Sequence, residues 1–267
     1  MKRNMPSRSD VVGLIPAGGH ATRLSPIPCS KEIYPVGFRR VDGRVHPKVV
    51  SHYLLENMRV AGVSRAYIVM RDGKWDIPAY FGGGIMLDMD LAYLLAGSSP
   101  GVPYTLDRAY PFVRQTVVAF GFPDILFDSE SAFSDLLNRQ ETTNADAVLG
   151  LFPADRPSVM DMVDVDDDGR VRAIVIQPAQ TNLSLSWDVA VWTPAFTEFL
   201  HNYLPCEKSA AAANPELSVG GVIQAAIEHG LLIEGIQVSD APYLDIGTPE
   251  GLTQALKRFS NLGVMAK

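Results

Sequence analysis

Residues 11–19 constrain the fold of this chain more than any other segment does. They begin with a short apolar run, VVGLI at 11–15, and PAGG at 16–19 follows it directly. A continuous apolar run that ends at glycines is typical of a strand buried on both faces of a parallel sheet. Apolar side chains at helical spacing then occupy residues 49–58, and 66–70 form a second buried run. Strand, helix and strand at this spacing predict a βαβ unit, and so an α/β fold with a parallel sheet covered on both faces.

The rest of the chain continues the alternation of helices and strands. Helices are predicted at residues 85–95, 131–140, 194–203, 222–229 and 248–259, and strands at 103–106, 116–122, 147–152, 163–165, 171–175, 189–192 and 231–238. The two strands around the DDDGR sequence at 166–170 predict a hairpin. A Ser- and Ala-rich stretch at 208–215 is predicted to be a surface loop. Because no repeat or linker divides the chain, we expect a flexible tail at 1–10 and a single domain at 11–267.

Charge and composition exclude several classes of protein. Lys and Arg number 23 and Asp and Glu number 30, so the net charge is −7, whereas a duplex-binding protein needs a basic face. No apolar run approaches the roughly 18 residues of a membrane span. Two cysteines are too few for a disulfide framework or a four-cysteine zinc site, and they fit a reducing compartment. We therefore expect a cytoplasmic protein that binds neither nucleic acid nor membrane.

The loop after the first strand has the residues of an anion site. Gly18 and Gly19 allow backbone N–H groups to approach a phosphate closely, and Arg23 and Lys31 follow with fixed positive charge. A tight turn without a ligand is the alternative interpretation. The loop is not a Walker A motif, because no Gly-Lys-Ser/Thr follows, and it lacks the G-x-G-x-x-G spacing of a dinucleotide-dependent oxidoreductase.

Two aspartates are candidates for the same crevice. Asp124 follows the predicted strand at 116–122, and Asp245 follows a short apolar run just before a helix start at 248–250. Each one alone could be an ordinary loop or cap residue. Mg²⁺-dependent phosphoryl or nucleotidyl transfer requires carboxylates that bind the metal and cations that bind the phosphates. Two carboxylates beside a cation-lined anion loop provide both.

A third acidic pattern does not predict a metal site. Asp164, Asp166 and Asp168-Gly169 match the opening of a calcium-binding EF-hand loop. That loop needs a bidentate Glu at its twelfth position, where this chain has Val175, and its flanks should be helices. A charged hairpin is therefore predicted instead.

Residues 14–37, LIPAGGHATRLSPIPCSKEIYPVG, resemble the signature of the sugar-phosphate nucleotidylyltransferases, which are also called nucleotide-sugar pyrophosphorylases. The segments at 121–124, 192–196 and 243–250 are similar to three further motifs of that family, in the same order. The resemblance implies a Rossmann-like domain, with a mixed, mostly parallel sheet flanked by helices. It also implies a reaction in which a sugar 1-phosphate attacks the α-phosphate of a nucleoside triphosphate and pyrophosphate leaves. The family is often dimeric or tetrameric, so a homo-oligomer is expected.

The resemblance implies a role for each matching residue. The backbone around Ala17, Gly18, Gly19, His20, Ala21 and Thr22 would bind the nucleotide. Arg23 would hold the triphosphate, Lys31 would contact phosphate at the reacting centre, and Asp124 would act with them. Asp124 and Asp245 would hold Mg²⁺.

The chain departs from the family pattern at four places. Ala21 replaces a glycine of the loop, Gln177 replaces a lysine that contacts the sugar phosphate, and Asp188 replaces a glycine beside the sugar. The family's base-reading loop and helix must fit into residues 107–115, which make at most about two and a half helical turns. That element is therefore predicted to be shortened or replaced. Arg108, Arg114 and Gln115 could supply substitute contacts or be solvated loop residues, and we favour the second interpretation.

Two hypotheses about function follow. The first is an active nucleotidyltransferase, which we favour because Arg23, Lys31, Asp124 and Asp245 are all present. The second is a catalytically silent relative that only binds a nucleotide or sugar phosphate, which the replacement of the lysine by Gln177 and the missing base-reading segment support.

Overall fold

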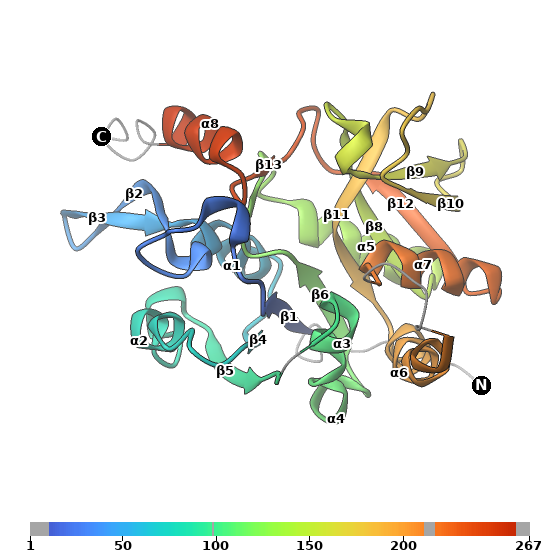
Figure 1. The fold of residues 1–267 in the computed structure, drawn as a ribbon, viewed down its shortest axis with the longest axis horizontal. Coiled ribbons are helices and arrows are strands. Elements are labelled where there is room, and N and C mark those ends of the chain that lie inside the picture. The colour runs from blue at the N-terminus through green and yellow to red at the C-terminus, as the bar shows by residue number, and fades with distance from the viewer. Residues whose placement is uncertain (1–10, 98, 211–216, 260–267) are drawn as a thin grey trace.

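The computed structural model describes residues 11–97, 99–210 and 217–259, and within 205–210 only the backbone. The predicted tail at 1–10 lies outside these residues. One sheet runs through the molecule, with the strand order β10-β9-β11-β6-β1-β4-β5 and with β8 and β12 joined to it beside β11 (Figure 1). The strands of this sheet are β1 (Val11–Ala17), β4 (Arg65–Met70), β5 (Asp90–Leu95), β6 (Val117–Gly121), β8 (Ala147–Pro153), β9 (Asp161–Val165), β10 (Val171–Ile176), β11 (Leu185–Trp192) and β12 (Ile233–Gln237).

The sheet combines a parallel block with antiparallel strands. β1 is parallel to β4 and to β6, and β5 is parallel to β4. β11 is antiparallel to β6, and β9 and β10 form an antiparallel hairpin on its other side. The predicted βαβ unit, hairpin and mixed, mostly parallel α/β fold are therefore confirmed.

Helices cover both faces of the sheet. They are α1 (Val50–Val60), α2 (Asp76–Phe81), α3 (Val102–Asp107), α4 (Tyr110–Val113), α5 (Ala132–Thr143), α6 (Pro194–Ala210), α7 (Val219–Glu228) and α8 (Pro249–Phe259). Side chains from α1, α2 and α5 form one core with the sheet, and those from α3, α4, α6 and α7 form a second core on the opposite face. β1 contributes alternately to both cores, with Ile15 in the first and Leu14 in the second. Burial on both faces is the reason that its sequence is continuously apolar. No helix in the described ranges has the length and apolar character needed to cross a bilayer.

Two small sheets lie outside the main one. β2 (Pro35–Val41) and β3 (Arg44–Val49) form a hairpin, and β7 (Ile125–Leu126) pairs with β13 (Leu244–Asp245). A third, smaller apolar cluster joins them beneath α8 and includes Val36, Leu126 and Phe259. In this way the C-terminal helix closes over the segment that follows β6 (Figure 1).

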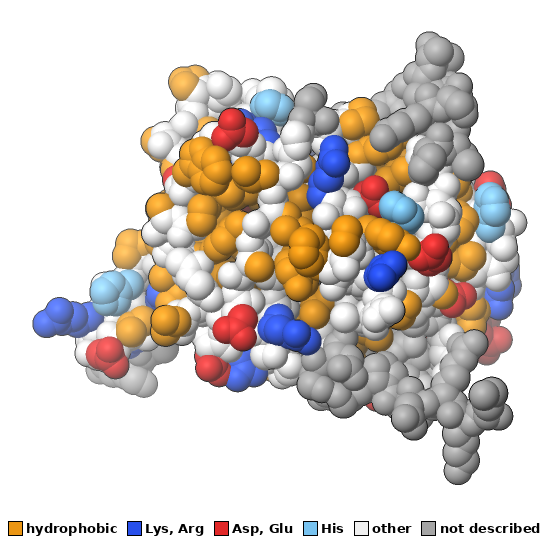
Figure 2. Space-filling model, turned by 90° about the horizontal axis from the view of Figure 1, so that it is seen from below, with side chains coloured by type: hydrophobic (Ala, Val, Ile, Leu, Met, Phe, Trp, Pro, Cys, Tyr) orange, Lys and Arg blue, Asp and Glu red, His pale blue; other side chains and the backbone are white. Residues whose placement is uncertain are grey.

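Two predicted elements are wrong. Residues 85–95 were expected to form a helix, but they form a short 3₁₀ turn and the edge strand β5. Leu95, at the end of that strand, is 53% exposed, and hydrophobic side chains gather on the face seen from below in Figure 2. Because several of its apolar residues are partly or fully exposed, this strand has neither the alternation nor the continuous burial that marks a strand in sequence.

Residues 103–106 form part of helix α3 instead of a strand. Pro103 lies at the second position of that helix, where its missing N–H costs nothing. The connection between β5 and β6 therefore holds two helices, α3 and α4. The prediction that only 107–115 were available there was wrong, because it counted α3 as a strand. The stretch at 208–215 also differs, since α6 continues to Ala210, and 211–216 lie outside the described residues.

Candidate active site

The candidate site lies where β1 and β6 end. These neighbouring strands are parallel, so their carboxyl ends meet at one edge of the sheet, where ligands bind in open α/β folds. The glycine loop follows β1, and Asp124 lies just beyond β6. The loop and Asp124 therefore lie together, as predicted, because β1 and β6 are parallel neighbours.

Asp245 reaches the same place through the small β7–β13 sheet. Asp245 pairs with Ile125 across that sheet, and the N–H of Ile246 donates to the carbonyl oxygen of Asp124 at 3.0 Å. A Cβ added to Gly247 would lie 2.8 Å from Asp245 Oδ1 and 3.4 Å from Asp124 Oδ2. Both carboxylates therefore face the same point beside Gly247, although 121 positions (245 − 124) separate them in sequence.

Each carboxylate pairs with one of the predicted cations. Lys31 Nζ donates to Asp124 Oδ2, and Arg23 Nη2 lies 3.2 Å from Asp245 Oδ2. The Lys31 side chain is only 15% exposed, whereas that of Arg23 is 61% exposed. Burial lowers the pKa of Lys31, but the charge and hydrogen bond of Asp124, with smaller contributions from Glu32 and Asp245, outweigh it. The net pKa of Lys31 is raised, so the ammonium stays charged at neutral pH.

The glycine loop lies between α3 and Lys31. A Cβ on Gly18 would approach Thr105 of α3 at 3.4 Å, and one on Gly19 would lie 3.9 Å from Lys31 Nζ. Gly19, His20 and Thr22 are exposed, so their backbone groups are accessible to a ligand. Thr105 is a residue near the loop that was not predicted, because a strand at 103–106 would not bring it there.

Ala21 adopts a backbone conformation that favours glycine. Its φ is +52° and its ψ is 36°, which is the left-handed region. An alanine in that region costs roughly 1–2 kcal/mol relative to the right-handed one. Ala21 therefore strains the loop, and a short 3₁₀ turn at Thr22–Leu24 follows.

Gln177 and Asp188 lie on the opposite side of Asp124 from the glycine loop. Gln177 follows β10 and is exposed, and its N–H donates to the carbonyl of Met160 at 3.2 Å. Asp188 is in β11, which separates β9 from β6. The strands thus bring these two predicted residues to one side of the site, with β9 between them.

Asp188 is a buried acid that no cation accompanies among the described residues. It is 5% exposed, and its Oδ2 has no hydrogen-bond partner there. Burial raises the pKa of Asp188 well above its ordinary value, and the charges of Asp124, Asp245 and Asp161 raise it further. This side of the site is therefore acidic.

Asp161 is a further residue of this side, which was not predicted from the sequence. It opposes Ile176 in the β9–β10 hairpin, so it lies beside Gln177, and burial raises its pKa to about 6. The available signal was an acidic residue at the start of a strand, DMVDV, whose neighbours are apolar.

The described residues contain no group of three or more His, Cys, Asp or Glu side chains that could hold a metal ion. Asp124 and Asp245 could supply two ligands. That number fits Mg²⁺, which proteins often bind through one or two carboxylates together with substrate phosphates and water.

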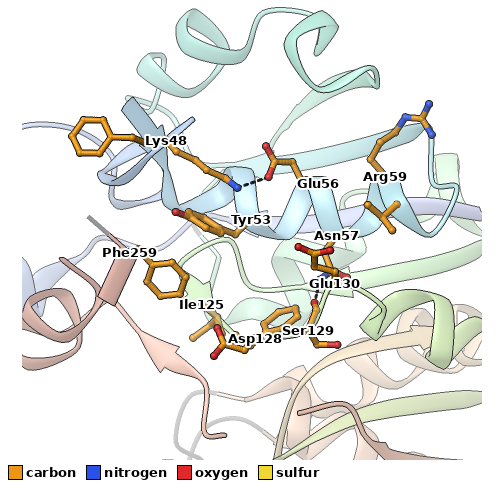
Figure 3. A pocket seen from close by; sticks show the side chains of 13 residues that line it. Lys48, Tyr53, Glu56, Asn57, Arg59, Ile125, Asp128, Ser129, Glu130 and Phe259 are labelled. Atoms are coloured by element: carbon orange, nitrogen blue, oxygen red, sulfur yellow. Dashed lines mark hydrogen bonds and ion pairs between the residues drawn. The ribbon is translucent and has the colours of Figure 1, made fainter. Parts of the chain in front are cut away.

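A separate cavity of about 870 Å³ lies between α1, the segment after β7 and the end of α8 (Figure 3). Tyr53, Ile125 and Phe259 line it, and Lys48 forms an ion pair with Glu56 at its rim, with an N–O distance of 2.5 Å. None of the residues assigned to the candidate site lines this cavity.

Comparisons with known proteins agree with the geometry. The family model described as "Nucleotidyl transferase" matches residues 12–261. The low-salt glycan biosynthesis nucleotidyltransferase Agl11 of Haloferax volcanii is 25% identical over 248 residues, which cover 91% of this chain and 64% of that protein. The glucose-1-phosphate thymidylyltransferase of Streptomyces antibioticus is 24% identical over 230 residues, which cover 84% of this chain and 60% of that protein. The chain thus spans about three fifths of the length of these relatives.

Solved structures show the same fold. A protein assigned as a glucose-1-phosphate thymidylyltransferase from Bacillus anthracis matches with a TM-score of 0.78 at 15% identity, over 94% of this chain and 96% of that one. A UDP-glucose pyrophosphorylase in complex with UDP-glucose matches with a TM-score of 0.73 at 17% identity, over 92% of this chain and 97% of that one.

Proposed function

This chain belongs to the nucleotidyl transferase family, and we propose that it transfers a nucleoside monophosphate from a nucleoside triphosphate to a sugar 1-phosphate or a similar phosphate, releasing pyrophosphate. One observation carries the proposal. The glycine loop, two cations and two carboxylates meet at the ends of β1 and β6, and the pairs Lys31–Asp124 and Arg23–Asp245 bring opposite charges together there. The relative from Streptomyces antibioticus is a glucose-1-phosphate thymidylyltransferase, which supports the acceptor class.

The triphosphate binds on the β1 side. Backbone N–H groups of residues 18–22 face the phosphates, and Arg23 is exposed enough to leave Asp245 and bind the leaving pyrophosphate. Lys31 lies closer to the centre and stabilises the charge that develops at the α-phosphate. No covalent nucleophile is needed, because positioning and charge stabilisation carry such a transfer.

The acceptor enters from the other side. In-line displacement requires the attacking and leaving oxygens to lie on opposite sides of the reacting phosphorus. Since the triphosphate occupies the β1 side of Asp124, the acceptor lies over β11, β9 and β10, where Gln177 and Asp188 are found. Gln177 can form a hydrogen bond with the acceptor but supplies no charge.

The proposed cofactor is Mg²⁺, held by Asp124 and Asp245. Both carboxylates face the point beside Gly247, and oxygen ligands of this kind suit the ion. When bound, the metal would neutralise negative charge on the phosphates.

The test is pyrophosphate release from a panel of nucleoside triphosphates and sugar 1-phosphates, with and without Mg²⁺. Asp124→Asn and Asp245→Asn should each abolish turnover, while Asp168→Asn, in the exposed hairpin, should leave it unchanged. Retained turnover in both site variants would contradict the assignment. A silent binding domain is the second candidate, favoured by the uncharged Gln177, and it predicts measurable nucleotide binding without turnover for every pair.

The expected setting is the cytoplasm, and the expected assembly is a homo-oligomer. Cys29 and Cys206, which fit a reducing compartment, support the first. The homo-oligomer is expected because members of the family are often dimers or tetramers, and light scattering of the purified protein would measure its oligomeric state.

A further inference from the structure

The segment that carries Lys31 is held from outside the site described so far. Ser30, just before Lys31, donates twice to Asp76: its N–H to Oδ2 and its hydroxyl to Oδ1, each at 2.7 Å. Asp76 is the first residue of α2, in the connection that follows β4. Since β4 is the neighbour of β1, this connection lies beside the segment and can hold it.

The residue after Lys31 is held just as firmly. Lys74 Nζ pairs with Glu32 Oε1 at 2.5 Å, and both side chains are less than 5% exposed. The backbone carbonyl of Glu32 accepts a hydrogen bond from the hydroxyl of Ser51 in α1 at 2.5 Å. Lys31 therefore lies between two residues that other elements fix in position.

The buried Glu32–Lys74 pair contributes little to the net stability of the fold. Burial raises the pKa of Glu32 and lowers that of Lys74, so both groups are shifted toward their neutral forms despite the pairing. Glu32 Oε2 has no hydrogen-bond partner among the described residues. Apolar side chains of similar volume often stabilise a protein as well as such a pair does. A hydrogen-bonded ion pair, unlike an apolar contact, also holds its two segments in one relative orientation.

The geometry of residues 71–76 allows one short segment to make both contacts. Gly73 has a φ of +87°, which favours glycine, and its N–H donates to Asp72 Oδ1 at 2.9 Å. The resulting turn presents Lys74 and Asp76 to the two neighbours of Lys31.

We propose that Asp76 and the Glu32–Lys74 pair are positioning residues, which hold the backbone at residues 30–32 so that the Lys31 ammonium points to Asp124 and the reacting phosphate. The proposal rests on the proposed function. Displacements of about 1 Å at a reacting centre can cost about 100-fold in rate, so a support of this kind affects catalysis without touching the substrate.

Asp76 offers the cleaner test, because its removal leaves no buried charge unpaired. We expect Asp76→Ala to lower kcat about 10- to 100-fold while KM for the nucleotide changes by less than about threefold, and Asp76→Asn, which keeps one acceptor, to lie between. Lys31 should also become about tenfold more reactive toward acetic anhydride, relative to the exposed Lys257, because its segment is displaced more often. Mass spectrometry of the labelled protein measures this without any turnover.

A matched control separates positioning from general stability. Glu234 is 8% exposed and pairs with Arg139 at 2.5 Å, on β12 and α5. Glu234→Gln should lower the melting temperature while leaving kcat and the labelling of Lys31 unchanged. Equal losses of kcat in Asp76→Ala and Glu234→Gln, or unchanged kcat and labelling in Asp76→Ala, would overturn the proposal. If the wild-type protein shows no turnover, the proposed function fails and the labelling alone decides this inference.

Discussion

Replacing Lys31 by methionine tests the electrostatic account of the site most directly. Methionine keeps much of the length of the side chain but removes its charge. Asp124 would then face Asp245 and Asp188 without the cation that it contacts, and both partners of the pair are largely buried, with 15% and 10% of their side chains exposed. We therefore expect Lys31→Met to destabilise the metal-free protein.

The burial of the Lys31–Asp124 pair determines how much stability the variant should lose. Removing one partner of a buried ion pair costs about 3–5 kcal/mol, and the partial exposure of this pair favours the lower limit, about 3 kcal/mol. For a chain of 267 residues, a loss of that size corresponds to a decrease of about 5 °C in melting temperature. The same variant should lose about 10²- to 10³-fold in kcat, because a charge aimed at the reacting phosphate is gone.

Thermal unfolding in EDTA and in Mg²⁺ provides the assay. A divalent cation bound at Asp124 and Asp245 would replace the lost positive charge, so Mg²⁺ should stabilise Lys31→Met more than it stabilises the wild type. A double-mutant cycle with Asp124→Asn isolates the pair, and the double variant should be more stable than the sum of the single losses implies. Arg59→Met is the control, because 39% of the Arg59 side chain and 83% of that of its partner Asp88 are exposed, and so exposed a pair should contribute less than about 1 kcal/mol.

Additive losses in the cycle would refute the reasoning, because they would mean that Lys31 and Asp124 do not depend on each other. A melting temperature of Lys31→Met equal to that of the wild type in EDTA would do the same. Stabilisation by Mg²⁺ that is equal in both proteins would leave the ion pair in place but contradict the proposed metal site.

Three further predictions follow from the same geometry. Folding raises the pKa of Asp161 from the ordinary 3.8 to about 6, so the folded state favours the protonated acid. The free energy of unfolding therefore falls as the pH rises from 3.8 through about 6. Urea denaturation should show that Asp161→Asn raises the free energy of unfolding by up to about 3 kcal/mol at pH 8 and by little at pH 4. A Cβ on Gly251 would lie 1.9 Å from the carbonyl oxygen of Asp245, so Gly251→Ala should lower the melting temperature and turnover, whereas Gly83→Ala, with open space around it, should leave both unchanged. Chelation of divalent ions should abolish pyrophosphate release, and Mg²⁺ should restore it; full activity in EDTA would exclude the metal.

The parts of the fold that were predicted correctly are those whose burial is uniform. β1 is buried on both faces, so its continuous apolar run could be interpreted without knowledge of its neighbours. Asp124 could be assigned to the same crevice because a parallel neighbour must end at the same edge of the sheet. Asp245 could not be placed by this argument, because only a short apolar run before it and the resemblance to a family indicated its position.

The incorrectly predicted elements lie at the edge of the sheet and beyond it. Tyr93 and Leu94 in β5 are half-buried, and Leu95 is exposed, so neither strict alternation nor continuous burial marks the strand. Local propensity cannot separate a short apolar strand from a buried helix of the same composition. Pro103 was a usable signal, because proline at the start of a helix is common and proline inside a strand is rare.

The residues that support Lys31 could not have been predicted from one sequence. Lys74 pairs with Glu32 across 42 positions, and Asp76 reaches Ser30 across 46. Nothing in the sequence near either residue indicates that it is buried or paired, because exposed loops contain the same residue types. Only the tertiary arrangement of β1 and β4 brings them together.

The charge balance of the site explains why a metal is expected there. Asp124, Asp245 and Asp188 act on one another electrostatically, and the whole chain carries a net charge of −7. Lys31 and Arg23 already neutralise two of these carboxylates, so a triphosphate entering the site meets little unpaired positive charge from them. A cation held by the carboxylates would release both side chains for the phosphates at the same time. We therefore expect nucleotide to bind far more tightly with Mg²⁺ than without it, and the difference to shrink in Asp124→Asn, where less negative charge must be neutralised.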